Sequence, residues 1–468
     1  MNENQKTLAE FKYEKAQVDK GYAKRTLYIN LSDNTIASKP VTETMKDVFI
    51  GGRGFGLWLL WHGIEDNTKW DDPENEIVIS SGPIGGITQY PGTGKSIVVT
   101  ISPTTHSIVD SNVGGYYGPY LKFAGFDAIE IQGKADREVI IYVDGVEGKV
   151  SIFEAPMETV DTHILTEELL EMFADPGKKQ YISSVTAGRG SDHTLIGCLN
   201  FSLYDIRRKH IRIKQAGRGG TGTVFRDKKI KALVVKSPDM KGNLNNPADP
   251  KLIASVGRRM NKEVKEQDPK MLSMRTKGTA VLVEIMDEFD LLPVHNFRYG
   301  SHPEAEKIAS TVWESLFDLN HPDGCWYGCT LSCSHSVKDY KIRTGPYKGQ
   351  IVCVDGPEYE SVAGLGSNLG IFEPFDILEL NFYCDTYGVD TISFGTLTGF
   401  VMECYEAGIL DKEITGGLEL TFGNFDAVVE LLHQMCKGDG FGKIAGMGIR
   451  RMKKFFTKEY GADPGFLQ

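Results

Sequence analysis

The sequence lacks the features that would point to a membrane, a secretory route or a nucleic acid. Its longest apolar runs are too short to span a bilayer, and its N-terminus, MNENQKTLAEFKYEKAQ, is polar, without a signal-peptide core. It has no basic block, and its net charge is −11. We therefore expect a cytoplasmic protein with no membrane span and no nucleic-acid partner.

Cysteine is scarce and unevenly placed. Eight scattered cysteines in 468 residues are no secreted disulfide framework, and in the cytosol they would stay reduced. Three of them form one run, Cys325, Cys329 and Cys333, in DGCWYGCTLSC. Thiolates suit iron–sulfur clusters, zinc or copper(I). The glycines in and before the run favour a wrapping loop or a broken helix start over a straight helix.

Three interpretations of this cysteine run stay open on the residues alone. The first is a stripe of buried free cysteines, since free cysteine behaves as a small hydrophobe. The second is a zinc site with His335 as fourth ligand, although structural zinc sites usually split their ligands into two separated pairs. The third, which the compact spacing favours, is a cubane iron–sulfur cluster that takes a fourth cysteine from elsewhere.

The pattern of residues predicts an α+β chain without an internal repeat or a low-complexity segment. Residues 1–20 read as a polar extension, and residues 21–236 as a β-rich, glycine-rich domain. Residues 237–250, rich in Pro, Asn and Asp, read as a linker. A period of 3.6 residues dominates 251–468 and predicts a mostly helical domain that carries the cysteine run.

Glycine-rich stretches in the β-rich part supply groups that can hold an anion. PGTGKS at 91–96 resembles the end of a P-loop, but the full motif requires glycine at position 89, which is Gln89, and the stretch runs into a strand pattern. We therefore reject nucleotide binding here. The closely approaching backbone and Lys95 still suit an anionic group such as a phosphate. SNVGGYYG contains Asn112 and Gly114, and a tight turn explains it equally well. AGRGGTG presents Arg218, a natural bidentate phosphate clamp.

Carboxylates follow the cysteine run in two patterns. GPEYE holds Glu358 and Glu360, which can do acid–base work, bind metal or simply start the following helix. Asp385-x-x-Gly388-x-Asp390 places aspartates around a helix end, where they can accept hydrogen bonds from the amino groups of a heterocycle.

In order, these stretches resemble the aldehyde ferredoxin oxidoreductase family, the tungsten-pterin enzymes, over nearly the whole chain. The matching landmarks are GGRGFG, GPIGG…PGTGKS…DSNVGGYYGPYLKFAGFDAIEIQGKA, AGRGGTG, LLPVHNF, the cysteine run, GPEYE and D-x-x-G-x-D. The resemblance implies a β-rich base that carries two pyranopterins around one tungsten or molybdenum ion, with a [4Fe–4S] cluster beside them. It also allows a Mg²⁺ ion that bridges the pterin phosphates.

The resemblance assigns roles residue by residue. The three cysteines of the run match cluster ligands, and Glu358 or Glu360 matches the family glutamate near the metal. The residues that match pterin or phosphate contacts are Lys95, Asn112, Gly114, Arg218, Asp385, Gly388 and Asp390.

Four departures from the family pattern stand out. The first cysteine gap is x3 where the family has x2, and Lys95 stands where the family has arginine. Cys353 lies near Glu358 and is either a further ligand of the metal or a buried strand cysteine. The chain ends at Gln468, before the expected third domain with the fourth cluster cysteine and a second pterin motif. A separate chain that supplies this domain, or a fragmentary sequence, would explain the last departure.

The resemblance predicts an enzyme that oxidises aldehydes to carboxylic acids, within a larger oligomer, and passes electrons to ferredoxin or to an iron–sulfur subunit. The close alternative is the branch of class II benzoyl-CoA reductases, which reduces aryl-CoA thioesters. In that branch His295, in PVHNF, is a candidate proton donor, although a buried structural histidine is an equal explanation. A third alternative is a subunit without the pterin-bound metal that only transfers electrons or serves as a scaffold.

Overall fold

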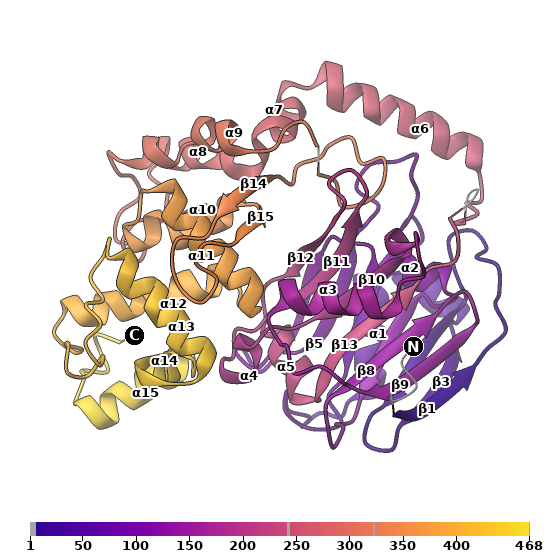
Figure 1. Cartoon of the computed structure of the whole chain (residues 1–468), viewed down its shortest axis with the longest axis horizontal. Coiled ribbons are helices and arrows are strands. Elements are labelled where there is room, and N and C mark those ends of the chain that lie inside the picture. The colour runs from indigo at the N-terminus through magenta and orange to yellow at the C-terminus, as the bar shows by residue number, and fades with distance from the viewer. Residues whose placement is uncertain (1–5, 241–243, 322, 468) are drawn as a thin grey trace. The chain divides into compact units, whose positions relative to one another are not determined.

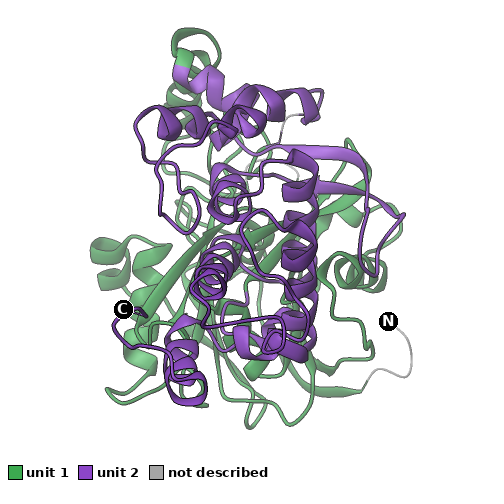
Figure 2. Cartoon of the chain, turned by 90° about the vertical axis from the view of Figure 1, so that its left-hand side faces the viewer, with its two compact units in different colours: residues 1–188, 198–269, 324–331 green, residues 189–197, 270–323, 332–468 purple. Residues whose placement is uncertain are grey.

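The computed structural model describes residues 6–240, 244–321 and 323–467. They divide into two compact units, coloured green and purple in Figure 2. Unit 1 comprises the chain up to Gly188 together with Cys198–Pro269 and Gly324–Leu331. Unit 2 comprises Arg189–Gly197, Lys270–Asp323 and the chain from Ser332 onward. The α+β prediction, with a β-rich N-terminal region and a helical C-terminal region, is confirmed.

The first sheet of unit 1 has six strands in the order β3-β2-β7-β4-β5-β6. Residues 22–35, YAKRTLYINLSDNT, alternate and end in a turn cluster, a pattern that predicts a strand and a hairpin corner, and β2 and β3 form that hairpin. The apolar runs IVIS, SIVVTI and AIEIQ form β4, β5 and β7. The strands are β2 (Arg25–Asn30), β3 (Thr35–Pro40), β4 (Ile77–Ser80), β5 (Ser96–Ile101), β6 (Ile108–Val113) and β7 (Ala128–Gln132).

The second sheet of unit 1 has seven strands in the order β1-β9-β8-β13-β10-β11-β12. Its strands are β1 (Thr7–Lys12), β8 (Val139–Asp144), β9 (Lys149–Glu154), β10 (Ile182–Thr186), β11 (Leu199–Asp205), β12 (His210–Ala216) and β13 (Ile230–Lys236). The residues predicted as a polar extension therefore include β1, an edge strand that pairs antiparallel with β9.

The two sheets repeat one topology, which the sequence does not reveal. In the first half β2 is parallel to β7, and β7, β4, β5 and β6 follow as antiparallel neighbours. In the second half β8 is parallel to β13, and β13, β10, β11 and β12 follow in the same way. The expectation of no internal repeat is wrong at the level of structure, because a fold needs only equivalent burial patterns and not equal residues.

Helices occupy equivalent places in the two halves (Figure 1). Helix α1 (Arg53–Gly63) precedes β4, and α3 (Thr162–Phe173) precedes β10. Helix α2 (Tyr117–Phe123) joins β6 to β7, and α5 (Thr221–Asp227) joins β12 to β13. The inner faces of both sheets share one apolar core, while α1 and α3 each cover an outer face, as expected for a layered domain.

The segment predicted as a linker is partly packed into unit 1. Asn245 is buried, and its side-chain amide donates to the carbonyl oxygen of Pro83 at 2.8 Å. The buried ammonium of Lys122 donates to the side-chain oxygen of Asn245 and to the carbonyl oxygens of Gly82 and Gly85. This network fixes the GPIGG turn before the glycine stretch at 91–96, because each of these polar groups is costly to leave unpaired in the core.

Helix α6 (Pro250–Lys262) opens the helical region and belongs to unit 1. Asp249 caps its first turn by accepting from the backbone N–H of Leu252 at 2.8 Å, and Pro250 occupies the first helical position. A single π turn, Glu263–Gln267, follows it within unit 1.

Unit 2 is built from helices and one hairpin. The longest helices have apolar residues on all sides and are mostly buried, as expected for the centre of a helical domain. Its elements are α4 (Gly190–His193), α7 (Pro269–Lys277), α8 (Leu282–Glu288), α9 (Ser310–Leu316), β14 (Ser336–Lys341), β15 (Ile351–Asp355), α10 (Tyr359–Leu365), α11 (Pro374–Tyr387), α12 (Thr391–Glu406), α13 (Phe425–Lys437), α14 (Gly440–Ala445) and α15 (Ile449–Tyr460). The first residue of α7, Pro269, still belongs to unit 1.

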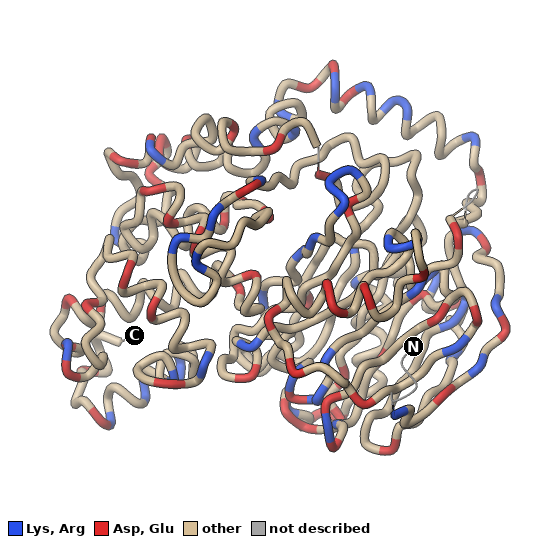
Figure 3. The backbone as a smooth tube through the Cα atoms, viewed as in Figure 1, with Lys and Arg blue, Asp and Glu red and all other residues tan. Residues whose placement is uncertain are grey.

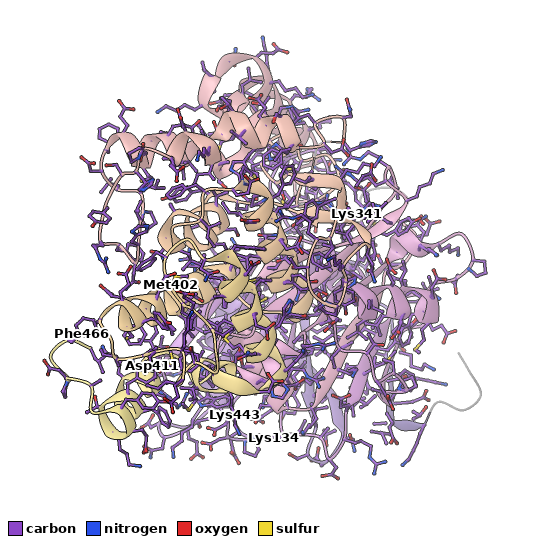
Figure 4. All side chains as sticks on the ribbon, turned by 60° about the vertical axis from the view of Figure 1, so that its left-hand side comes forward. Lys134, Lys341, Met402, Asp411, Lys443 and Phe466 are labelled. Atoms are coloured by element: carbon purple, nitrogen blue, oxygen red, sulfur yellow. The ribbon has the colours of Figure 1, made fainter. Side chains whose placement is uncertain are left out.

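The 3.6-residue period predicts helices near 374–387, 391–408, 426–437 and 443–458. The first three correspond to α11, α12 and α13, whereas the fourth is two helices, α14 and α15. Cys384, Cys404 and Cys436 lie in helical patterns that predict core positions, and all three are fully buried in the core of unit 2. Met402 of α12 belongs to the same core and is labelled in Figure 4. Within the described ranges, no helix is both long and apolar enough to cross a bilayer.

Candidate active site

The loop that carries the first two cysteines of the run is part of unit 1. The chain leaves unit 2 after Asp323, contributes Gly324–Leu331 to unit 1 and returns to unit 2 at Ser332. Trp326 anchors this loop, since its indole is only 3% exposed. Its ring packs against Tyr116 and Tyr120 of unit 1, with ring centroids 4.9 and 5.8 Å apart. An indole buried in this way fixes the backbone on either side of it.

Two of the predicted glycine stretches meet this loop. A Cβ atom on Gly94 would overlap the carbonyl oxygen of Cys325 and lie 2.8 Å from Cβ of Trp326. A Cβ atom on Gly114 would lie 3.5 Å from Cβ of Cys325. Gly328, with φ of +76°, approaches the carbonyl oxygen of Thr88. Gly94 and Gly328 therefore have to be glycines, because larger residues would push the loop away.

The thiols of Cys325 and Cys329 are neighbours. Their mutual hydrogen bond, followed by burial, raises the pKa of Cys325 far above its ordinary value, so in the free protein this group is a neutral thiol. The backbone N–H of Gly94 and the charge of Lys95 act in the opposite direction and favour the thiolate. A cation or cluster bound here would take the place of the shared proton, since metal binding requires thiolates.

The rest of the cysteine set lies in unit 2. Cys333 follows the loop, and its carbonyl oxygen is 3.1 Å from Nδ1 of His335. Cys353 is half-buried on β15. Over residues 6–240, 244–321 and 323–467, no three His, Cys, Asp or Glu side chains converge closely enough to hold a metal ion. The assignment of Cys325, Cys329, Cys333 and Cys353 as metal ligands stays a prediction.

Asn112 and Arg218 lie at the ends of equivalent elements. Asn112 is an exposed residue near the end of β6, so it extends from a strand and not from a tight turn. Arg218 is exposed in the glycine turn between β12 and α5. The same turn places Gly219, with φ of +92°, against Val109 of β6. The turn after β12 therefore packs against the start of β6, on the same strand that carries Asn112 near its other end.

A row of buried polar side chains in the second half escaped the sequence reasoning. Thr186, Asn200 and Gln215 are direct cross-strand neighbours on β10, β11 and β12, so they point to the same face. The Thr186 hydroxyl, both polar atoms of the Asn200 amide and Nε2 of Gln215 are buried without a hydrogen-bond partner in the described structure. In the repeated topology, Gln215 occupies the strand position of Asn112.

Orphaned polar groups also occur in the first half. The hydroxyls of Ser96, at the start of β5, and of Tyr117, in α2, are buried without a partner in the described structure. A buried group of this kind costs about 1–3 kcal/mol if nothing pairs with it, so such groups commonly mark water or ligand positions. Lys214 of β12 was also missed, and its side chain flanks Gly114. Lys214 continues the polar phase of the alternating strand HIRIK, so the sequence gives no signal beyond its place just before a glycine turn.

Glu358 is held in a defined orientation in unit 2. It is half-buried at the N-cap of α10, and its Oε2 accepts a hydrogen bond from the hydroxyl of Thr279. The same hydroxyl oxygen accepts from the backbone N–H of Tyr359 at 2.9 Å. Glu360 is exposed in the first turn of α10. Glu358 is therefore the more buried carboxylate of the GPEYE turn, and Thr279 fixes its orientation.

The D-x-x-G-x-D stretch joins two helices. Gly388 ends α11 in the left-handed conformation, with φ of +67°, and its carbonyl oxygen accepts from the Ser191 hydroxyl at 3.3 Å. Asp390 caps α12 by accepting from the backbone N–H of Ser393 at 2.9 Å. Asp385 is mostly buried and accepts from the side-chain amide of Asn381 at 3.2 Å. Asp390 therefore has a structural task of its own, whatever its role toward a ligand.

His295 has an aromatic environment. Its ring stacks on Phe422 with centroids 4.6 Å apart, lies 6.0 Å from His302, and is approached by Gly370. Burial, and then the neighbouring His302, lowers the pKa of His295, which favours the neutral imidazole. None of these neighbours is another predicted site residue.

The chain has clear relatives among known proteins. Residues 26–237 match the family described as aldehyde ferredoxin oxidoreductase, N-terminal domain, and residues 255–464 match its domains 2 and 3. The tungsten-containing aldehyde ferredoxin oxidoreductase of Pyrococcus horikoshii is 33% identical over 445 residues, which are 94% of this chain and 68% of that protein. The aliphatic sulfonate oxidoreductase, WOR-like subunit, of Pyrococcus furiosus is 30% identical, with the same two coverages.

A solved structure shares the fold. In the active-site complex BamBC of benzoyl coenzyme A reductase with 1,5-dienoyl-CoA, one chain superposes with a TM-score of 0.72 at 20% identity. The match covers 94% of this chain, which spans 64% of the length of that one. Both family regions, the relatives and the order of the landmarks agree, and the chain belongs to the aldehyde ferredoxin oxidoreductase family of oxidoreductases.

Proposed function

We propose that this chain is a tungsten-bispterin, [4Fe–4S]-dependent oxidoreductase that oxidises aldehydes to carboxylic acids and passes the electrons to an iron–sulfur carrier such as ferredoxin. The observation that carries the proposal is the approach of two glycine stretches to Cys325 within unit 1. The relatives at 33% and 32% identity, which are tungsten-containing aldehyde enzymes, support this choice of reaction.

The residues present fit a phosphate-bearing pterin. Buried polar groups without partners occur in both halves of the repeat, at Ser96 and Tyr117 in the first and at Asn200 and Gln215 in the second. A ligand with many donors and acceptors would satisfy them, and two equivalent halves suit two equivalent ligands. Each half contains a cation beside a glycine turn: Lys95 lies just before β5 in the first half, and Arg218 lies just after β12 in the second.

In this proposal, Lys95 and Arg218 hold the pterin phosphates, Lys95 as a point charge and Arg218 as a planar fork. Asn112 and Asp385 bind polar edges of the pterin, and Gly114 lets it approach the backbone. The bound metal supplies two-electron chemistry, and the cluster passes electrons singly. Cys325, Cys329 and Cys333 are three of the four cluster ligands, so the fourth comes from outside the run.

Glu358 moves the proton in this proposal. Oxidation of an aldehyde to an acid consumes one water and releases two protons and two electrons, so a base must take a proton from the incoming water. The hydrogen bond from Thr279 holds the Glu358 carboxylate in one orientation. Glu360 is exposed and exchanges protons with solvent more readily.

A second candidate function is the reduction of an aryl-CoA thioester. It is favoured by the likeness in fold to a subunit of a benzoyl-CoA reductase complex and by the C-x3-C spacing with Cys353 near Glu358. In that case the protonated form of His295 is a candidate proton donor, and its lowered pKa makes this form less populated at neutral pH.

One set of measurements separates these functions. The purified protein is analysed for tungsten, molybdenum and iron, and is then assayed with viologen dyes against simple aldehydes and against benzoyl-CoA. Aldehyde-dependent dye reduction supports the first function, and turnover only with the aryl-CoA supports the second. Iron without tungsten or molybdenum contradicts both and leaves an electron-transfer or scaffold role.

A further inference from the structure

We propose that the exposed face of α6 is the docking surface for a small acidic electron-transfer protein. The proposal concerns where the electrons leave or enter the chain, and it rests on the proposed function in that the cysteine loop must carry a redox cluster. Three features of α6 support it: its two faces, its contact with the cysteine loop and its unpaired charges.

The two faces of α6 differ sharply. Ile253, Gly257 and Met260 recur at helical spacing and face inward, with Gly257 fully buried. Lys251, Ser255, Arg258 and Lys262 recur at spacings of four, three and four residues, so they form a single stripe. At 100° per residue this stripe lies opposite the inward one, and all four of its residues are exposed.

Within unit 1, a hydrogen bond joins α6 to the cysteine loop, and the inward face of α6 packs on the stretch before β5. A Cβ atom on Gly257 would overlap the carbonyl oxygen of Gln89, so helix and backbone touch there. Asn261 accepts a hydrogen bond from the hydroxyl of Thr330, which directly follows Cys329. A protein seated on the outer face would thus be separated from the cysteine loop by about one helix diameter, ~10 Å.

The charges of α6 are unusual for this chain. Between Pro250 and Lys262 there are four cations and no carboxylate, in a chain with a net charge of −11. Figure 3 shows blue bands repeated along this helix. Within the described residues, none of Lys251, Arg258, Arg259 and Lys262 forms an ion pair.

Helix stability explains only part of this stripe, because Lys262 alone among its cations lies in the last turn, where the helix dipole favours a positive charge. Arg258 and Lys262 are like charges four residues apart, which weakens a helix, and Lys251 in the first turn opposes the helix dipole. A row of unpaired cations beside a redox loop instead complements an acidic partner, because opposite charges steer two proteins together and set their register. The occupant we infer is therefore an acidic iron–sulfur protein of small size.

A second basic helix provides a matched control. Arg450 and Lys454 of α15 are also exposed and four residues apart. The inner side of α15 packs Phe456 against Phe400 of α12 in unit 2, with ring centroids 6.2 Å apart. The two helices therefore share the charge pattern, but α6 contacts the cysteine loop within unit 1, whereas α15 belongs to unit 2.

The test compares the double variants R258E/K262E and R450E/K454E with the wild-type holoprotein. Binding of an acidic two-cluster [4Fe–4S] ferredoxin is measured by biolayer interferometry at low and at high ionic strength, and dye-linked turnover is measured in parallel. We expect R258E/K262E to raise the Kd at low salt by about tenfold or more, through a slower association rate. R450E/K454E should stay within about twofold of wild type.

Added salt should weaken wild-type binding and narrow the gap between wild type and R258E/K262E, because the surface charges become screened. Dye-linked turnover should be unchanged in both variants, since viologens need no docking protein. Equal losses in the two variants, no loss in either, or no ferredoxin binding by the wild type would overturn the proposal. A change in the oligomeric state of R258E/K262E, seen by light scattering, would also overturn it, because the stripe would then bind a second copy. Failure of the proposed function would look different, as ferredoxin binding without any dye-linked turnover.

Discussion

Replacing Gly94 with alanine should move the cysteine loop and empty the cluster site. The added methyl would lie 2.8 Å from Cβ of Trp326, where carbon atoms normally stay about 3.5–4.0 Å apart. It would also overlap the carbonyl oxygen of Cys325. The loop would therefore have to retreat by about 1 Å, well beyond the ~0.2 Å to which metal–ligand distances are held.

The expected result is a loss of most of the bound iron together with a modest loss of stability. Overpacking of this kind typically costs about 1–3 kcal/mol, so the protein should still fold. Iron is measured per chain after purification under anaerobic conditions, and the free energy of unfolding is measured in urea by circular dichroism.

Gly82→Ala is the matched control for this substitution. A Cβ atom there would meet nothing within 4 Å, and the backbone of Gly82 needs no left-handed conformation. The free energy of unfolding should stay within about 0.5 kcal/mol of wild type, and the iron content should equal that of wild type within experimental error. If Gly94→Ala kept its iron and its stability as Gly82→Ala does, the loop would not lie against Gly94 and the reasoning would be wrong.

Three further substitutions test other parts of the chain. Thr279→Val removes the hydroxyl that orients Glu358, so kcat for the aldehyde should fall about tenfold with little change in KM or in the melting temperature. An unchanged kcat would show that Glu358 takes no part in the proton transfer. Glu76 is buried and its pKa is raised to about 8, first by burial and then by Glu130, so its neutral form is favoured in the folded state and its stability contribution is lost as the pH rises toward 8. Glu76→Gln should therefore match wild type near pH 4.5 and be more stable above pH 8, by up to about 5 kcal/mol in urea unfolding, and a constant difference across this range would contradict the assignment. Cys404→Ser should lower the free energy of unfolding by about 1–2 kcal/mol while the iron content stays at the wild-type value. The reason is that burial raises the pKa of this thiol to about 12 and leaves it a neutral core residue. A loss of iron would instead indicate that Cys404 is a cluster ligand.

The structure also explains which sequence patterns could be read correctly. Helices α11, α12 and α13 were predictable because each begins with a capping residue and ends near glycine or alanine, and those local signals act within a few residues. The helix predicted over 443–458 is interrupted because Gly446 and Gly448 end one helix and start another. Strand β1 was missed because an edge strand of mixed polar residues has no apolar alternation of its own.

The sequence by itself determined the chemistry that this protein can offer. Three closely spaced thiols, glycine stretches with single cations and a capped carboxylate turn are local patterns, and their order along the chain identifies the family. These features survive in the sequence because each depends on the residue type and on spacings of a few positions.

Only the tertiary structure decided which of these groups meet. It placed Cys325 against Gly94 and Gly114, more than 200 residues away in the chain, and assigned the loop of Cys325 and Cys329 to the β-rich unit. It also showed that the two sheets repeat one topology, which set Gln215 in the position of Asn112. Contacts of this kind arise from the packing of whole strands and helices, which depends on burial and shape and leaves no pattern in neighbouring residues.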